Sequence, residues 1–193
     1  MVRGDSDCAW AVRADIPEAL ALELNRWAAR EPPSAAWERP LLHSERYTAL
    51  LGGRIRSGPA FTFPQHLEDL GETFGVDSEE ELSQCFSGWV AGEIAAGRGP
   101  VLAVRDGGHV VSICFCARRS AQAAEAGIET AADFRRRGYA PRVAIAWARR
   151  IRAENRIPIY STDWSNHASL AVARKLGLLP FATDFSVETV GES

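Results

Sequence analysis

Apolar residues recur every three or four positions near the N-terminus, and this spacing predicts an amphipathic helix. The helix is expected from about Ile16 to Ala29, because Asp15 and Glu18 stand at capping-box spacing around Pro17, a residue that suits a first helical turn. One face of this helix should pack against the rest of the molecule. Its buried stripe consists of Leu20, Leu24 and Trp27.

A second helix is predicted to begin at a capping box formed by Ser78 and Glu81 and to end at Gly97. Its apolar positions also recur at intervals of three and four: Leu82, Phe86, Trp89, Val90 and Ile94. The stretch between the two helices is rich in Pro and Gly (EPPSAAWERP, then GGRIRSGP). We therefore expect mostly loop there, with the short run PAFTFP as a strand or a pocket-lining loop.

From about residue 98 the pattern changes from helical spacing to strands. VLAVRD and HVVSICFCA are β-rich runs joined by the hairpin signal Gly107-Gly108, and AEAGIET is a third strand. A helix with Val143, Trp147 and Ile151 in register follows. The strand IPIYSTDW, a helix over SNHASLAVARKLG and a last strand, PFATDFSVETV, complete the pattern.

Two strands on either side of a crossover helix imply a parallel pair inside an otherwise antiparallel sheet. The predicted fold class is therefore α/β (α+β), with a mixed, mainly antiparallel sheet flanked by helices. At 193 residues the chain is expected to form one folded unit. Within it we distinguish an N-terminal helical and loop part, 1–97, from a core, 98–193.

Composition and charge argue against several classes of protein. With 46% hydrophobic and 24% charged residues the chain is too apolar to be disordered, and a net charge of -3 gives no reason to expect nucleic acid as a partner. No stretch of about 18 apolar residues suggests a membrane span, and the N-terminus lacks the apolar run of a signal peptide. We therefore expect a cytoplasmic protein. Abundant Ala and a single lysine, Lys175, suggest a bacterial source.

The four cysteines have neither C-x-x-C spacing nor a nearby His pair, so they predict neither a metal site nor a disulfide framework. Cys114 and Cys116 would share one face of a strand. We interpret them as small buried hydrophobic residues rather than as a redox pair.

The segment that carries chemistry is Arg135 to Ala140, RRRGYA, between a strand and the start of a helix. A helix N-terminus presents unpaired backbone N–H groups and the positive end of the helix dipole, which together suit a pyrophosphate. Gly138 and Ala140 are small enough to let phosphate oxygens approach the backbone, and the three arginines add positive charge. The segment is neither a Walker loop nor a G-x-G-x-x-G loop.

This segment resembles the GNAT superfamily signature [RQ]-x-x-G-x-[GA], which Arg135, Gly138 and Ala140 match. A later part, Asn166-His167-Ala168-Ser169 followed by Ala173 to Leu178 (ARKLGL), is similar to the family's second motif. The resemblance covers roughly Pro100 to Val187. It implies a GNAT-like fold, acetyl-CoA as co-substrate, no metal, and direct transfer of the acetyl group to an amine without a covalent acyl-enzyme.

The resemblance also implies which residues hold acetyl-CoA. The strand Ala124 to Thr130 should splay from its neighbour, so that backbone groups near its end pair with the pantetheine arm and an N–H stabilises the oxyanion. Asn166 either contacts the pantetheine or caps a helix, or does both. The expected cofactor-binding residues are Glu129, Thr130, Ala131, Arg135, Arg136, Arg137, Gly138, Tyr139, Ala140, Asn166 and Ser169.

Two positions depart from the family pattern. Pro141 lacks the N–H that would extend the phosphate cradle, although proline is tolerated in a first helical turn. Ala173 stands where many relatives carry a tyrosine thought to protonate the departing thiolate. A water or the hydroxyl of Ser169 is expected to supply that proton instead.

The acceptor must lose a proton before it attacks, since an alkylammonium with a pKa near ~10.4 is almost wholly charged at neutral pH. Glu125 and Glu129 lie four apart on one strand and face the same side; either could be the base, or both could be merely solvated carboxylates. Candidates for gripping the amine are Tyr160, Asp163 and Trp164, with core packing expected for at least one aromatic.

Two functions remain open. The favoured one is an N-acetyltransferase for a small-molecule or peptide amine; the alternative is a catalytically silent acyl-CoA-binding sensor or interaction module of the same fold. The aromatic residues Trp37, Phe61 and Phe63 are expected to wall the acceptor pocket. Because only one strand follows the last helix, an open sheet edge and a homodimer formed through it are also expected.

Overall fold

The computed structural model describes residues 1–189, which form two compact units whose segments alternate along the chain. The first unit contains residues 1–60, 161–167 and the described residues from 180 onward. The second contains residues 61–160 and 168–179. Each unit thus includes residues from both sides of the division at residue 97 that the sequence suggested.

The second unit contains a mixed run of strands. β8 (Ile157–Ser161), β7 (Ala123–Thr130), β6 (His109–Arg119), β5 (Leu102–Asp106) and β4 (Phe74–Gly75) are neighbours in that order. β7 and β8 pair in parallel around the crossover helix α4 (Tyr139–Ala153), and the other pairs are antiparallel. The predicted fold class, including the hairpin of β5 and β6, is confirmed.

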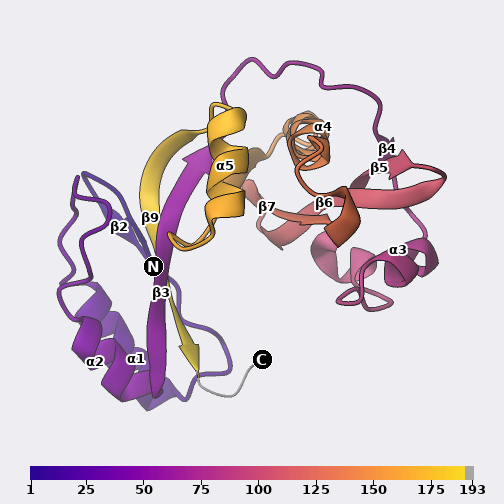
Figure 1. Cartoon of the computed structure of the whole chain (residues 1–193). Coiled ribbons are helices and arrows are strands. Elements are labelled where there is room, and N and C mark those ends of the chain that lie inside the picture. The colour runs from indigo at the N-terminus through magenta and orange to yellow at the C-terminus, as the bar shows by residue number, and fades with distance from the viewer. Residues whose placement is uncertain (190–193) are drawn as a thin grey trace. The chain divides into compact units, whose positions relative to one another are not determined.

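Helices cover both faces of this part of the sheet, with α4 on one side of β5 and β6 and α3 (Glu79–Cys85) on the other (Figure 1). On the α4 side Val143, Trp147 and Ile151 are buried as predicted, together with Cys114 and Cys116. The alternation of side chains along β6 sends Ile113 and Phe115 to the α3 side instead. There they pack with Leu82, Phe86 and Trp89.

The helix predicted from Ser78 to Gly97 is wrong over its second half. α3 ends at Cys85, and only a short π-helical turn, η1 (Ile94–Arg98), follows. The carboxylate of Glu79 accepts the backbone N–H groups of Gly92 and, at 2.6 Å, Ile94, so it stabilises a chain that folds back on itself. The hydroxyl of Ser78 makes no capping bond, which leaves the predicted capping box unformed.

The first unit combines two helices with the remaining strands. Its strand order is β2 (Cys8–Ala9), β1 (Val2–Arg3), β9 (Leu179–Thr189) and β3 (Gly53–Thr62). The first predicted helix is present as α1 (Glu18–Ala28), but its capping box is wrong, because Asp15 pairs with Arg13 at 2.8 Å and no side chain caps the helix. A helix, α2 (Ser44–Leu51), and most of β3 occupy a stretch that was expected to be loop.

Strand β9 is not the open edge that the sequence suggested. It lies between β1 and β3, and Val2 of β1 pairs with Asp184 of β9. An N-terminal strand therefore covers β9, which removes the argument for a homodimer formed through this edge. Among residues 1–189 no helix is both long enough and apolar enough to cross a membrane.

Candidate active site

The loop before α4 has the open backbone that the sequence predicted. Gly138 stands at the N-terminal end of α4 with φ of +90°, a conformation that L side chains rarely adopt. A Cβ atom at Gly138 would meet only the Nζ atom of Lys175, at 3.7 Å. Pro141 lies buried in the first turn of α4, where its missing N–H costs nothing. The backbone at this helix N-terminus is therefore accessible to an anion.

The three arginines of the loop have different surroundings. Arg135 donates to the carbonyl oxygen of Thr130 at 3.2 Å. Arg137 donates to the carbonyl oxygen of Asp133 at 2.9 Å, and its guanidinium lies 4.9 Å from the centre of the Phe134 ring. Within residues 1–189 the side chain of Arg136 makes no hydrogen bond or ion pair. Two of the three predicted phosphate ligands thus also hold the loop together.

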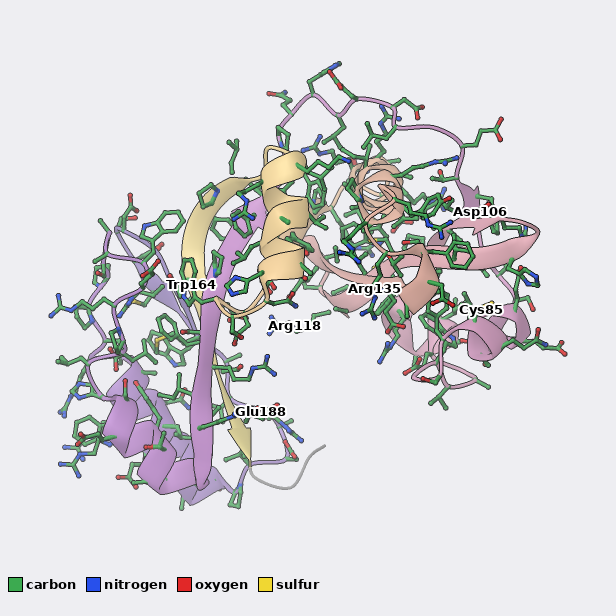
Figure 2. The ribbon with its side chains drawn as sticks, viewed as in Figure 1. Cys85, Asp106, Arg118, Arg135, Trp164 and Glu188 are labelled. Carbon is green, nitrogen blue, oxygen red and sulfur yellow. The ribbon has the colours of Figure 1, made fainter. Side chains whose placement is uncertain are left out.

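Asp106 links the loop to the β5–β6 hairpin, a role that sequence reasoning missed. It lies at the end of β5, while Arg135 lies in the loop that leads into α4 (Figure 2). The hydroxyl of Tyr139 donates to Asp106 at 2.6 Å, and Arg137 lies 3.7 Å from the same carboxylate oxygen. The bond to Asp106 raises the pKa of Tyr139. No local pattern connects these positions, because they are 33 residues apart.

Lys175 is the second residue that the sequence analysis passed over, although it lies inside the quoted motif. It is the last residue of α5 (His167–Lys175), its side chain is exposed, and it lies beside Gly138. Its ammonium group has no hydrogen-bond or ion-pair partner within residues 1–189. A basic residue near the end of a helix that follows the loop was the only signal that could have pointed to it.

Strand β7 separates from β8 over its second half. The parallel pairing covers Ala123–Glu125 opposite Ile157–Ile159 and goes no further, although β7 continues to Thr130. The N–H of Ala131 donates to the carbonyl oxygen of Val111 in β6 at 2.9 Å. Backbone groups alternate in direction along an antiparallel strand, so the backbone N–H and C=O of Glu129 also face β6. The backbone groups that face away from β6 are those of Ile128 and Thr130. The N–H of Ala131 is therefore used by β6 and is not available to a pantetheine arm.

The two candidate bases share one face of β7, as predicted, but differ in their partners. Glu125 forms an ion pair with Arg118 of β6 at 2.6 Å, and only 17% of its side chain is exposed (Figure 2 labels Arg118). The carboxylate of Glu129 makes no hydrogen bond or ion pair within the described residues. Of the two, Glu129 is therefore the carboxylate that is able to take a proton without breaking an ion pair.

The residues expected to grip the amine have different surroundings. Tyr160 is the core aromatic: it is 3% exposed, and its hydroxyl donates to the carbonyl oxygen of Ser169 at 3.3 Å, in the first turn of α5. Burial raises the pKa of Tyr160. Asp163 accepts bonds from the hydroxyl and N–H of Ser165 and lies 3.3 Å from Arg56. These contacts, those from Ser165 first, lower the pKa of Asp163 and fix its position.

Trp164 and Trp37 line a wide, open depression of about 550 Å³ in the first unit. Trp164, labelled in Figure 2, lies beside β3, and its backbone N–H donates to the carbonyl oxygen of Ser57 at 3.2 Å. Asn166, two residues further on, directly precedes α5. Phe63, by contrast, is buried against Trp147 in the core of the second unit, so its expected place in an acceptor pocket is wrong. Among residues 1–189 no cluster of three or more His, Cys, Asp or Glu could hold a metal ion.

Several solved structures with the same fold are described as members of the GNAT family. One, described as an acetyltransferase of that family from Novosphingobium aromaticivorans, is 17% identical with a TM-score of 0.60, and the match covers 69% of this chain and 64% of the other. An acetyltransferase from Colwellia psychrerythraea is 17% identical with a TM-score of 0.51, and the match covers 74% of this chain and 62% of the other. A GCN5-related N-acetyltransferase from Kribbella flavida is 15% identical with a TM-score of 0.53, and the match covers 76% of this chain and 64% of the other.

In each of these three comparisons the chain spans less than two thirds of the other protein's length. Identities this low establish the fold alone. A comparison with curated protein sequences gave no match. The model of the GNAT acetyltransferase family matches residues 67–182, more than half of the chain and both of its motifs. The chain therefore belongs to the GNAT acetyltransferase family.

Proposed function

We propose that this protein is an N-acetyltransferase that moves the acetyl group of acetyl-CoA directly to an amine. The observation that carries the proposal is the loop before α4, where Gly138 leaves the helix N-terminus open next to cationic side chains. Family membership supports acyl transfer as the reaction class. The open side of β7 supports a thioester arm laid along that strand.

The residues fit the phosphate end of acetyl-CoA. Backbone N–H groups of the first turn of α4 are free to donate to phosphate oxygens, since no side chain caps this helix. Arg136 and Lys175 contribute positive charge from two different elements. Arg135 and Arg137 shape the loop around these groups through their bonds to the carbonyl oxygens of Thr130 and Asp133.

In the proposed reaction, different residues act on the acceptor, the carbonyl oxygen and the leaving thiolate. Glu129 removes a proton from the ammonium form of the acceptor, so that the amine is able to attack the thioester carbonyl carbon. The N–H of Thr130, which faces away from β6, donates to the carbonyl oxygen as it gains negative charge. The C–N bond forms and the C–S bond breaks, and the second proton of the attacking nitrogen passes by way of the hydroxyl of Ser169 or a water to the departing thiolate.

The buried position of Ala173 favours a second candidate, a catalytically silent acyl-CoA-binding module. Ala173 is 2% exposed and packs in the core, so no acid occupies the place of the family's tyrosine. A thiol with a pKa near ~8.5 leaves tolerably well as a thiolate at neutral pH, and for that reason we favour the enzyme.

The single lysine allows a direct test of cofactor placement. An amine-reactive acylating reagent should modify only two amines, Lys175 and the N-terminal amine of Met1, which bonds to the carbonyl of Phe185 at 2.7 Å and serves as the internal control. We expect coenzyme A to protect Lys175 but not Met1, and pantetheine, which lacks the phosphates, to protect neither. Equal labelling of Lys175 with and without saturating coenzyme A would contradict the assignment.

A thiol-release assay with acetyl-CoA and a panel of amines separates the two candidate functions. The enzyme should release coenzyme A only when an amine is present. Protection of Lys175 without release from any amine, tested from pH 6 to 9, would favour the acyl-CoA-binding module.

A further inference from the structure

A pocket of about 340 Å³, open to solvent, lies within the second unit between the turn η1 and the end of β6. Glu93 and residues 96–98 line it on one side, and residues 116–119 line it on the other. Its volume lies near the lower end of the range of roughly 300–1,000 Å³ that small-molecule sites occupy. Three of its lining residues are arginines: Arg98, Arg118 and Arg119.

Contacts within the second unit orient the guanidinium groups of Arg98 and Arg119. Arg98 forms an ion pair with Glu93 at 3.0 Å, and its guanidinium lies 5.1 Å from the centre of the Phe115 ring. Arg119 donates to the carbonyl oxygen of Gly99 at 3.0 Å. Because a guanidinium presents several N–H donors in a rigid fork, each of these two groups is held in place and still has donors for a ligand.

The charges around the pocket favour a ligand group with a single negative charge. Glu93 balances Arg98, and Glu125 balances Arg118, which Figure 2 labels, at 2.6 Å. Arg119 forms no ion pair within residues 1–189. One positive charge therefore remains, and a planar carboxylate matches both this charge and the fork of a guanidinium. A phosphate dianion would exceed the remaining charge.

The pocket lies on the same side of the sheet as Glu129. A Cβ atom at Gly127 would lie 2.5 Å from the Phe115 ring, which packs on the α3 side, so Gly127 faces that side. Side chains alternate along a strand, and Glu125 and Glu129 therefore face the α3 side as well. Because Arg98 of the pocket lies against the same Phe115 ring, the pocket and the proposed base share one face of one unit.

The spacing along β7 determines the length of a ligand that reaches both places. Glu125, which pairs with Arg118, is four residues from Glu129, a distance of about 13 Å along an extended strand. An arginine side chain covers part of this distance, and the ligand must span the remainder. Gly127 and, opposite it, Phe115 lie in between and add no polar side chain. A chain of methylene groups is therefore the best match for the middle of the ligand.

We infer that this pocket binds a carboxylate of the acceptor, so that the enzyme prefers amines whose carboxylate is at the far end of an extended apolar chain. The inference rests on the proposed function and names its substrate class. An ω-amino acid has this arrangement. An α-amino acid does not, because its carboxylate adjoins its own amine.

The test uses the intact protein and acetyl-CoA with 6-aminohexanoate, with its uncharged counterpart 6-aminohexanamide, and with the shorter acid 3-aminopropanoate. We expect kcat/KM for 6-aminohexanoate to be about tenfold above that for the amide, because only the acid makes charged hydrogen bonds in the pocket. The shorter acid does not reach the pocket from the base, so its kcat/KM should be at least about tenfold below that of 6-aminohexanoate.

Variants of one arginine identify the contact. Arg119→Gln should reduce the preference for the acid over the amide to about twofold or less, and Arg119→Lys, which keeps the charge, should retain about half of it. Arg150→Gln is the matched control, because Arg150 pairs with Glu154 on α4 outside the pocket, and the preference should not change. In all three variants kcat/KM for 6-aminohexanamide should stay within about twofold, which distinguishes a lost carboxylate contact from a folding defect.

Equal kcat/KM values for 6-aminohexanoate and 6-aminohexanamide in the unmodified protein would overturn the inference while leaving acetyl transfer intact. Acetylation of other amines but of neither of these two would also overturn it. These comparisons need no variant, so a folding defect in Arg119→Gln does not affect them. If no amine is acetylated, the proposed function fails, and calorimetry with 6-aminohexanoate decides on the pocket alone. Binding that Arg119→Gln weakens about tenfold supports the carboxylate site, and absence of binding refutes it.

Discussion

The proposed cofactor loop before α4 and the depression lined by Trp37 and Trp164 present different kinds of chemical group. The loop before α4 presents backbone groups, and these are accessible because Gly138 has no side chain. The depression presents the side chains of Trp37 and Trp164, and a bond from the buried hydroxyl of Thr183 to the carbonyl of Trp37 holds one of its segments in place. Backbone recognition suits a co-substrate common to a whole family, whereas side-chain recognition is free to differ between members. The predictions below test this contrast.

The largest effect should come from the proposed general base, Glu129. Glu129→Gln is expected to lower kcat/KM at neutral pH about a hundredfold and to remove the limb of the pH profile that reports the base. Glu125→Gln is the matched control on the same strand face, and we expect it to act through the ion pair with Arg118 instead, with less than about a tenfold loss. Comparable losses and identical pH profiles for both variants would contradict the assignment of Glu129.

The second largest effect should be on cofactor affinity. Gly138→Val is expected to weaken acetyl-CoA binding about thirtyfold or more in calorimetry, because a branched side chain both strains the backbone at φ of +90° and fills the phosphate cradle. Gly52→Val carries similar backbone strain at φ of +67° but lies outside the loop. Unchanged affinity in a folded Gly138→Val protein would remove the loop from the cofactor site.

A smaller effect should distinguish loop positioning from direct contact. Tyr139→Phe loses the hydrogen bond to Asp106, and we expect about a fivefold weaker acetyl-CoA affinity, close to the value of one hydrogen bond. The kcat/KM for acetyl-pantetheine, which lacks the phosphates, should stay within about twofold. Equal losses for both donors would show a general folding defect instead of a positioned loop.

The smallest effect should appear at Asp163, beside Trp164, at acid pH. The folded-state pKa of Asp163 is lowered by Ser165 and Arg56, so its contribution to stability is present above its unfolded value of about 3.9 and is lost as pH falls through the folded value. Asp163→Asn should therefore show a shallower fall in Tm below pH 4 than the unmodified protein. Parallel Tm curves for the two proteins would contradict this account.

Sequence reasoning succeeded where local periodicity and a glycine coincide. The strand, loop and helix around Gly138 were predicted because apolar spacing defines α4. The anion site was predicted because a helix N-terminus that follows a small residue leaves its backbone N–H groups open to an anion. The parallel pairing of β7 and β8 followed from the crossover rule. Each of these features depends on neighbours in the chain.

Sequence reasoning failed where the structure depends on a contact between residues that are far apart in the sequence. The fold-back after α3 depends on Glu79 reaching Ile94, and the glycine-containing segment of β3 is a strand because it pairs with β9, which lies more than 100 residues later in the chain. The ion pair of Glu125 with Arg118 depends on strand register. None of these contacts produces a periodic pattern in the sequence. Choosing between Glu125 and Glu129 as the candidate base therefore required the structure.

The interleaving of the two units determines the order in which the chain is able to fold during synthesis. Most of the second unit is continuous from residue 61 to 160, so its sheet and α4 are able to assemble early. Val2 pairs with Asp184, and Arg3 with Thr183, so β1 has no partner in β9 until almost the whole described chain has left the ribosome. The N-terminal segment of the described chain therefore belongs to the unit that is completed last, and until then the Trp37 segment lacks its bond to Thr183.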